Sequence, residues 1–133
     1  MLIPKKTKLY SILNLKCPRC NEGDLFSNKS AYSPLRESIT MPERCSCCGL
    51  KYEKETGFYY GAMYVSYAVN VALSVAIFVA YFVLFWSYPL HYFIIADVIT
   101  ILATFPVISR VSRAIWINFF YKFQEPGQYI KEI

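Results

Sequence analysis

Two apolar stretches decide the fold of this chain: Gly61–Trp86, GAMYVSYAVNVALSVAIFVAYFVLFW, and Tyr92–Ser109, YFIIADVITILATFPVIS. Asp97 is the one charged residue in either stretch. As helices they would be about 39 Å and about 27 Å long at about 1.5 Å per residue, against about 30 Å for the hydrocarbon core of a bilayer. Ser87–His91 separates them and contains a helix breaker, Pro89. The sequence therefore predicts a membrane α-helical protein with a two-helix transmembrane hairpin over residues 57–109.

The size and composition of the chain favour this class over a soluble one. A chain of 133 residues has room for one membrane unit and one small module. Its 56% hydrophobic and 18% aromatic content is typical of membrane proteins. The alternative is a buried helix pair in a soluble protein. It would need a covering layer, and the remaining residues are too few to supply one.

The positive charges predict the orientation of the hairpin. Residues 1–56 carry ten Lys and Arg, residues 110–133 carry four, and the loop at 87–91 carries none. Short loops rich in Lys and Arg stay in the cytoplasm. We therefore expect both termini to be cytoplasmic and the loop to face outward.

Residues 1–16 form a basic lead-in, in which lysines alternate with apolar side chains. Its apolar run, Leu9–Leu15, is too brief and too polar for the core of a signal peptide. Two interpretations stay open. The lead-in is either an amphipathic element that rests on anionic membrane lipid or an arm that packs onto the module that follows.

Two C-x-x-C pairs, at residues 17–20 and 45–48, have the separation of a zinc ribbon. Each pair aims two thiolates at one ion. Asn21 and Gly49 follow the pairs, and both residue types tolerate the left-handed backbone that such a turn commonly needs. Because Gly49 comes directly after Cys48, we expect Cys47 to be spare. The predicted zinc ligands are Cys17, Cys20, Cys45 and Cys48.

Four cysteines fill the coordination sphere of Zn²⁺, so the predicted zinc is structural and leaves no position for a reacting water. Thiols in the cytoplasm stay reduced, which favours metal binding over disulfides. A redox C-x-x-C is the alternative, but it would need a thioredoxin-like βαβ pattern that the sequence lacks. We predict a zinc-ribbon module over residues 17–56. Short strands are expected at Leu25-Phe26 and Leu50–Tyr52, and a loop or extended excursion at Ser27–Ser38.

Small and polar residues recur every four positions along the first apolar stretch, which places them on one helix face. They are Ala62, Ser66, Asn70 and Ser74. Tight helix packing is the expected use of this stripe, and a ligand path is the alternative. Gly57 and Gly61 form a G-x-x-x-G spacing at the membrane edge, where either close helix approach or a glycine hinge would explain them.

Asp97 is the unusual residue of the second helix, because a carboxylate at a helix centre costs about 2.5–3.5 kcal/mol on insertion scales. A hairpin folded about Tyr88-Pro89 would place Asp97 opposite Ala80 and Tyr81, with Asn70 too deep to be its partner. We expect a contact with another subunit or another copy of the chain. A proton or ion site is the alternative.

Pro106 is expected to kink or end the second helix, after which Arg110 and Arg113 would meet the lipid headgroups. Apolar side chains then recur at helical spacing up to Phe123. Residues 110–133 are therefore predicted to be an interfacial amphipathic helix, over 110–124, and a short polar tail.

Several of these stretches together resemble a known family. They are Cys17–Cys20 with Gly23–Phe26, Cys45–Tyr52, Gly57–Tyr67, and Phe105-Pro106 with Arg110 and Ala114. Their order is similar to that in an uncharacterised family of small bacterial membrane proteins, catalogued as domain of unknown function 983, and looks closest to Bacteroidetes-type members. The resemblance implies an N-terminal zinc ribbon and two transmembrane helices, with no catalytic residues to carry over. Some proteobacterial relatives are encoded beside assembly factors of haem-copper oxidases, which implies a respiratory role. Asn21 departs from the glycine usual at its position.

These observations favour a non-enzymatic protein of the bacterial inner membrane, with the ribbon as a cytoplasmic docking module. It would be an accessory subunit or assembly factor of a larger complex, with membrane lipid and other subunits or a second copy as partners. The sequence shows no nucleophile–base pair, phosphate loop, open metal site or evident small-molecule substrate. One alternative is a proton or ion relay through Asp97. Another is a ribbon that binds nucleic acid, which the balance of six Lys and Arg against six acids over residues 17–56 disfavours.

Overall fold

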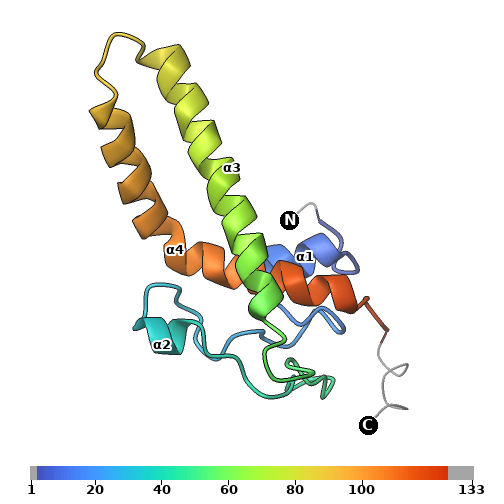
Figure 1. Ribbon diagram of the computed structural model, residues 1–133. Helices are drawn as coiled ribbons and strands as arrows, with labels where there is room; N and C mark the ends of the chain where they lie inside the picture. The colour runs from blue at the N-terminus through green and yellow to red at the C-terminus, as the bar shows by residue number, and fades with distance from the viewer. Residues whose placement is uncertain (1–2, 126–133) are drawn as a thin grey trace.

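The computed structural model describes residues 3–125, which form two long helices and two short ones (Figure 1). The short helices are α1 (Lys8–Asn14) and α2 (Leu35–Ser38), and the long ones are α3 (Tyr60–Leu84) and α4 (His91–Phe120). Helix α3 and the first half of α4 rise as a hairpin, and the remaining segments gather at its base (Figure 1).

The hairpin has the dimensions of a membrane-crossing unit. Both long helices are long and apolar enough to span a bilayer, judged by length and composition. None of the most apolar window of α3 is buried, and 11% of that of α4 is, so neither is the buried core helix of a soluble fold. Residues 85–90 connect them, and the Tyr81 hydroxyl donates to the carbonyls of Tyr88 and Pro89 at 2.5 and 2.9 Å.

Pro106 lies inside α4, and the helix changes direction midway so that its second half crosses the base of the hairpin (Figure 1). Proline lacks the N–H that would bond to the carbonyl four residues earlier, and its ring crowds that carbonyl, which bends a helix. The Tyr32 hydroxyl donates to the neighbouring Ala103 carbonyl at 3.2 Å. The predicted kink is confirmed. The helix predicted over 110–124 is the second half of α4, which runs unbroken to Phe120, and its place at the membrane interface stays a prediction. The tail beyond Glu125 lies outside the described residues.

The register of the hairpin differs from the prediction. Ser74 of α3, and not Ala80 or Tyr81, lies opposite Asp97, since the Ser74 hydroxyl donates to Asp97 Oδ2 at 3.2 Å. Helix α3 ends at Leu84 and α4 begins at His91, so the chain turns about residues 85–90 and not symmetrically about Tyr88-Pro89. Asp97 therefore faces a deeper level of α3 than the sequence suggested.

The segment around the cysteines contains no strand among the described residues, so the strands predicted at Leu25-Phe26 and Leu50–Tyr52 are not confirmed. Two isolated bridges stand in their place, Lys16 with Asp24 and Arg44 with Lys51. Each bridge is followed at once by a tight cysteine turn, which uses the backbone groups that a longer ladder would need. The excursion at 27–38 also contains the short helix α2.

Helix α1 packs on the second half of α4. Thr7 caps its start by accepting from the Tyr10 N–H, and Leu15 ends it in a left-handed conformation at φ 52°. Ser11 is fully buried, and the Lys8 ammonium donates to the Asn118 carbonyl at 2.9 Å. Helix α1 thus packs on α4, whereas the second interpretation had the lead-in packing onto the cysteine module; a contact with that module is the Asn21 side-chain amide, which donates to the Lys5 carbonyl. The contact of the lead-in with lipid stays a prediction.

Candidate metal centre

The four cysteines predicted as ligands come together in one buried cluster. The Sγ atoms of Cys17, Cys20, Cys45 and Cys48 all lie within 4.8 Å of one another. Cys17 Sγ is 3.6 Å from Cys48 Sγ, and Cys20 Sγ is 3.7 Å from Cys45 Sγ. Four sulfurs bound tetrahedrally at about 2.3 Å would lie about 3.8 Å apart. The cluster can therefore hold a metal ion, and its spacing fits zinc.

The first cysteine turn closes on itself through backbone hydrogen bonds. The Cys17 N–H donates to the Gly23 carbonyl at 2.8 Å, and the Asn21 N–H donates to the Cys17 carbonyl at 2.9 Å. Asn21 has φ 57°, the left-handed backbone expected after the pair. Gly23 was not singled out from the sequence, yet a Cβ there would lie 2.3 Å from Cys45 Sγ. Any side chain at Gly23 would enter the space of the four sulfurs.

The second turn repeats this arrangement. The Cys45 N–H donates to the Leu50 carbonyl at 2.9 Å, and the Gly49 N–H donates to the Cys45 carbonyl at 3.0 Å. Gly49 has φ 72°, again left-handed as expected. Cys47 is exposed and lies outside the cluster, although its N–H donates to Cys45 Sγ at 3.4 Å.

Tyr52 connects the two turns. It is almost fully buried, and its hydroxyl donates to the carbonyl of Asp24 at 3.0 Å. Burial raises the pKa of this phenol well above its usual range. Tyr52 therefore stays a neutral hydrogen-bond donor that ties the second turn to the chain after the first. The sequence offered a weak signal for it, as an aromatic residue four positions after Cys48.

The thiols differ in how readily they ionise. Hydrogen bonds from Cys17 and Cys20 lower the pKa of Cys45, whereas hydrogen bonding to Cys20 and Cys45 raises that of Cys17. Burial raises the pKa of Cys48 to about 12. Of these three thiols, Cys45 is the one whose thiolate form the surrounding groups favour. A cation supplies the positive charge that lets a set of thiolates share a buried site, which is why such sites exchange protons for metal.

The core around the cysteines extends into α4. Leu25, Phe26 and Leu50 pack in the same cluster as Ala114 and Ile117, both of which are fully buried. Arg19 and Gln124 also join the two parts, through Gln124 N–H to the Arg19 carbonyl at 2.9 Å and Arg19 Nε to Gln124 Oε1 at 2.8 Å. The cysteine module and the bent half of α4 share one core.

Arg110 is the clearest correction to the sequence prediction at this junction. It was expected at the lipid headgroups, but it is 2% exposed. Its guanidinium donates to three backbone carbonyls, those of Ser38 at 2.8 Å, Lys29 at 3.2 Å and Asn28 at 2.6 Å. It also stacks on Phe26, with Cζ 4.9 Å from the ring centre. Arg110 thus fastens the 28–38 excursion to α4.

The residues predicted to pack the hairpin lie either where α3 meets α4 or in the linker that precedes α3. Gly57 has φ 81°, which fits a hinge. A Cβ on Gly61 would lie 2.1 Å from the Trp116 ring, which fits close approach. Ser66 borders the bend of α4. Ser74 bonds to Asp97, while Asn70 Oδ1 and Asp97 Oδ1 are buried without a hydrogen bond among the described residues.

The fold and the site together define a helical protein with two candidate membrane helices and a four-cysteine metal site. The chain belongs to the family of proteins of unknown function DUF983, whose sequence model matches residues 35–121, more than half of its length. This confirms the resemblance to the family. The match includes Cys45 and Cys48 but begins after Cys17 and Cys20. Searches of curated proteins and of solved structures find no match to this chain.

Proposed function

We propose that this chain is a membrane-anchored zinc-ribbon protein that acts as an accessory subunit or assembly factor of a larger membrane complex. The hairpin crosses the bacterial inner membrane, the ribbon and both termini are cytoplasmic, and the second half of α4 lies along the interface. Its role is structural recognition and not catalysis. A respiratory complex of the haem-copper oxidase type is the first candidate partner, by the family resemblance.

The single observation that carries this proposal is the shared core of the cysteine module and α4. A closed four-cysteine site stabilises a fold and has no open position for a substrate. The cysteine module packs directly on α4, in addition to its covalent connection to α3. The metal would therefore hold a surface of the module at a set height above the bilayer. This is what a docking module requires. The exposed second turn, with Ser46 and Cys47, belongs to that surface.

The membrane placement is tested by labelling from either side of the membrane. In a Cys47→Ser background the remaining four cysteines are buried, so an added thiol is the accessible one. We expect a thiol at Ser87 to react from outside in intact spheroplasts, and one at Ser30 to react only after lysis. Both serines are exposed in the chain. The opposite pattern would contradict the orientation derived from the Lys and Arg distribution.

The partner role is tested by gentle solubilisation of the tagged, metal-loaded chain from its own membrane. We expect a defined membrane complex to co-purify with the wild type and with Cys47→Ser, and to be lost with Cys20→Ser, which breaks the metal site. A wild-type chain that purifies alone would contradict the proposal. So would a complex that Cys20→Ser retains in full, because the ribbon would then have no part in it.

One observation favours a second candidate, a proton or ion site in the hairpin. Asp97 Oδ1 and Asn70 Oδ1 are both buried acceptors without a hydrogen bond among residues 3–125. Buried polar atoms normally have partners, and a proton or cation bound at such an oxygen would supply one. Asp97 substitutions, described in the Discussion, separate this function from a packing role.

A further inference from the structure

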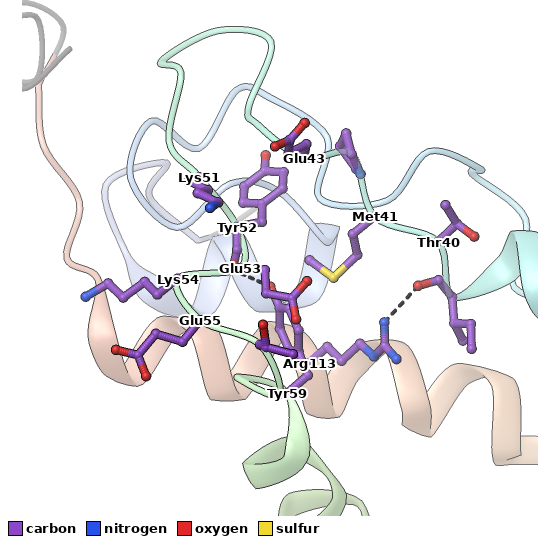
Figure 2. A pocket seen from close by; sticks show the side chains of 13 residues that line it. Thr40, Met41, Glu43, Lys51, Tyr52, Glu53, Lys54, Glu55, Tyr59 and Arg113 are labelled. Atoms are coloured by element: carbon purple, nitrogen blue, oxygen red, sulfur yellow. Dashed lines mark hydrogen bonds between the residues drawn. The ribbon is translucent and has the colours of Figure 1, made fainter.

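A groove crosses the junction between the hairpin and the cysteine module. Its outer part, of about 700 Å³, is bounded by the segment after α2, the segment after the second cysteine turn, and α4 (Figure 2). Its inner part, of about 270 Å³, lies between the start of α3 and the bend of α4. Ile39, Tyr59 and Arg113 line both parts, so the two adjoin.

The inner part is apolar and lies at one edge of the hairpin. Met63 and Phe105 line it and are 66% and 49% exposed. The contact between Ser74 and Asp97 sets the register of α3 against α4. Two helical turns closer to the base of the hairpin, Ser66 of α3 is therefore level with Phe105 of α4. From Leu84 to Ser66 the rise along α3 is about 27 Å, close to the thickness of a hydrocarbon core. The inner part therefore lies where acyl chains meet headgroups.

Six charged residues line the outer part, three of each sign, and the two whose charges act on the Tyr59 phenol are Arg113 and Glu53. Arg113 Nη1 donates to the Ile39 carbonyl at 2.8 Å, and its guanidinium lies 5.3 Å from the centre of the Tyr59 ring. Burial raises the pKa of Tyr59, the charge on Arg113 acts against this, and the charge on Glu53 adds to it. All three residues line the outer part of the groove. Arg113 and Glu53 form no ion pair with each other in the described structure. Each retains capacity for a ligand.

The other charged residues at this rim are Glu43, Lys51, Lys54 and Glu55. Figure 2 shows Glu43 and Lys51 near Tyr52, on the side away from Arg113. Figure 2 shows the Lys54 and Glu55 side chains extending away from the space that Arg113, Met41 and Glu53 surround. The Lys54 ammonium lies over the Tyr121 ring, 4.8 Å from its centre.

We infer that this groove binds one zwitterionic phospholipid of the phosphatidylethanolamine type. The phosphate lies at Arg113, the primary ammonium at Glu53, and an acyl chain between Met63 and Phe105. This rests on the membrane placement proposed above. An anionic headgroup, as in phosphatidylglycerol, has no positive charge that could pair with the Glu53 carboxylate. The trimethylammonium of phosphatidylcholine is positive but cannot donate a hydrogen bond to that carboxylate. A free phosphate would leave the apolar part of the groove unused.

Lipid retention by the full, metal-loaded chain tests this inference. The protein is reconstituted in nanodiscs of equal parts phosphatidylethanolamine, phosphatidylglycerol and phosphatidylcholine, released into mild detergent, and weighed by native mass spectrometry. We expect one retained phosphatidylethanolamine per chain. Glu53→Gln should reduce its preference over phosphatidylcholine about tenfold, the scale of one charge-assisted hydrogen bond. Arg113→Gln should abolish retention.

Matched controls separate binding from folding. Glu55→Gln and Arg36→Gln remove the same charges from exposed positions outside the proposed contacts and should retain the lipid as the wild type does. Metal content verifies that the Arg113 variant is folded. Equal retention of the three lipids, preference for phosphatidylglycerol, or an unchanged preference in Glu53→Gln would each overturn the lipid site while leaving the membrane placement intact. Failure of the chain to enter nanodiscs would overturn both.

Discussion

The cysteine module and the hairpin are each stabilised in a different way. The module has a small core with directed hydrogen bonds to specific backbone atoms, and it covers the guanidinium of Arg110 from α4. The hairpin has one seam between two helices and leaves most of its apolar side chains exposed. In the module, buried polar groups are accommodated by hydrogen bonds. In the hairpin, the exposed side chains are apolar ones that a bilayer would cover.

This difference indicates which part of the chain depends on a bound metal for its stability. A module of this size buries little apolar surface, so a bound metal would supply much of its folding free energy. The hairpin satisfies its backbone internally through two helices, as a bilayer demands. Substitutions in the module should therefore act through metal binding and folding of the module. Substitutions in the hairpin should act through the packing of α3 against α4.

The largest effect is expected from the metal ligands. Cys20→Ser should lose the zinc, since three thiolates with a hydroxyl hold it poorly, and should expose the module to proteolysis. Metal analysis and limited proteolysis measure this. Cys47→Ser, in the second cysteine turn but outside the cluster, should bind zinc normally. Zinc lost from Cys47→Ser but kept by Cys48→Ser would reverse the choice of ligand.

Loss of Arg110 should have the next largest effect and should act locally. Arg110→Met removes the donor shared by three carbonyls at a buried site. We expect the module to be destabilised by about 3 kcal/mol, with faster hydrogen exchange over residues 28–38. Arg36→Met, an exposed arginine in that excursion, is the matched control. Equal exchange in the two variants would show that the excursion folds without its fastening to α4.

The sequence predicted what depends on spacing and composition. The two apolar helices follow from uncharged length, the cysteine cluster from paired turns, and the left-handed Asn21 and Gly49 from the geometry those turns need. The bend at Pro106 follows from proline chemistry. Each of these depends on neighbours within a few residues, or on an ion that draws its ligands together.

What the sequence could not give depends on contacts between distant segments. Arg110 was placed at the headgroups because an arginine after an apolar run usually lies there, and nothing local shows that the carbonyls of 28–38 fold onto it. The partner of Asp97 was missed because the loop at 85–90 shifts the register of α4 against α3. The requirement for glycine at position 23 comes from Cys45, far along the chain.

A smaller effect is expected where the two regions meet, at Gly61. In Gly61→Val the new side chain would enter the Trp116 ring, whose Nε1 donates to the Phe58 carbonyl at 2.8 Å. The start of α3 should move off α4 at a cost of about 1–3 kcal/mol, seen as a lower midpoint of thermal unfolding and a shifted tryptophan emission. Ala68→Val, on an exposed face of the same helix, should change neither. If both variants behave alike, the junction is not packed as described.

The smallest structural effect, and the most informative about function, is expected at Asp97. Its Oδ2 accepts from Ser74 and its Oδ1 is covered by the chain itself, so the carboxyl faces α3 more than a second subunit. If its role is packing, Asp97→Asn should keep assembly and function, because the amide preserves shape and hydrogen bonding. Asp97→Leu should weaken both, since Ser74 would lose its acceptor and the seam its fit.

A proton or ion site gives a different pattern in the same pair of variants. Neither Asn nor Leu titrates, so both should fail in a deletion strain complemented with each variant, while the Asn variant still co-purifies with its complex. Ser74→Ala is the control, because it removes the contact but keeps the acid. Intact assembly with abolished growth in Asp97→Asn, together with normal growth in Ser74→Ala, would contradict the packing role. The hairpin would then hold a chemical site of its own, and the contrast with the module would no longer be one between a metal centre and a plain anchor.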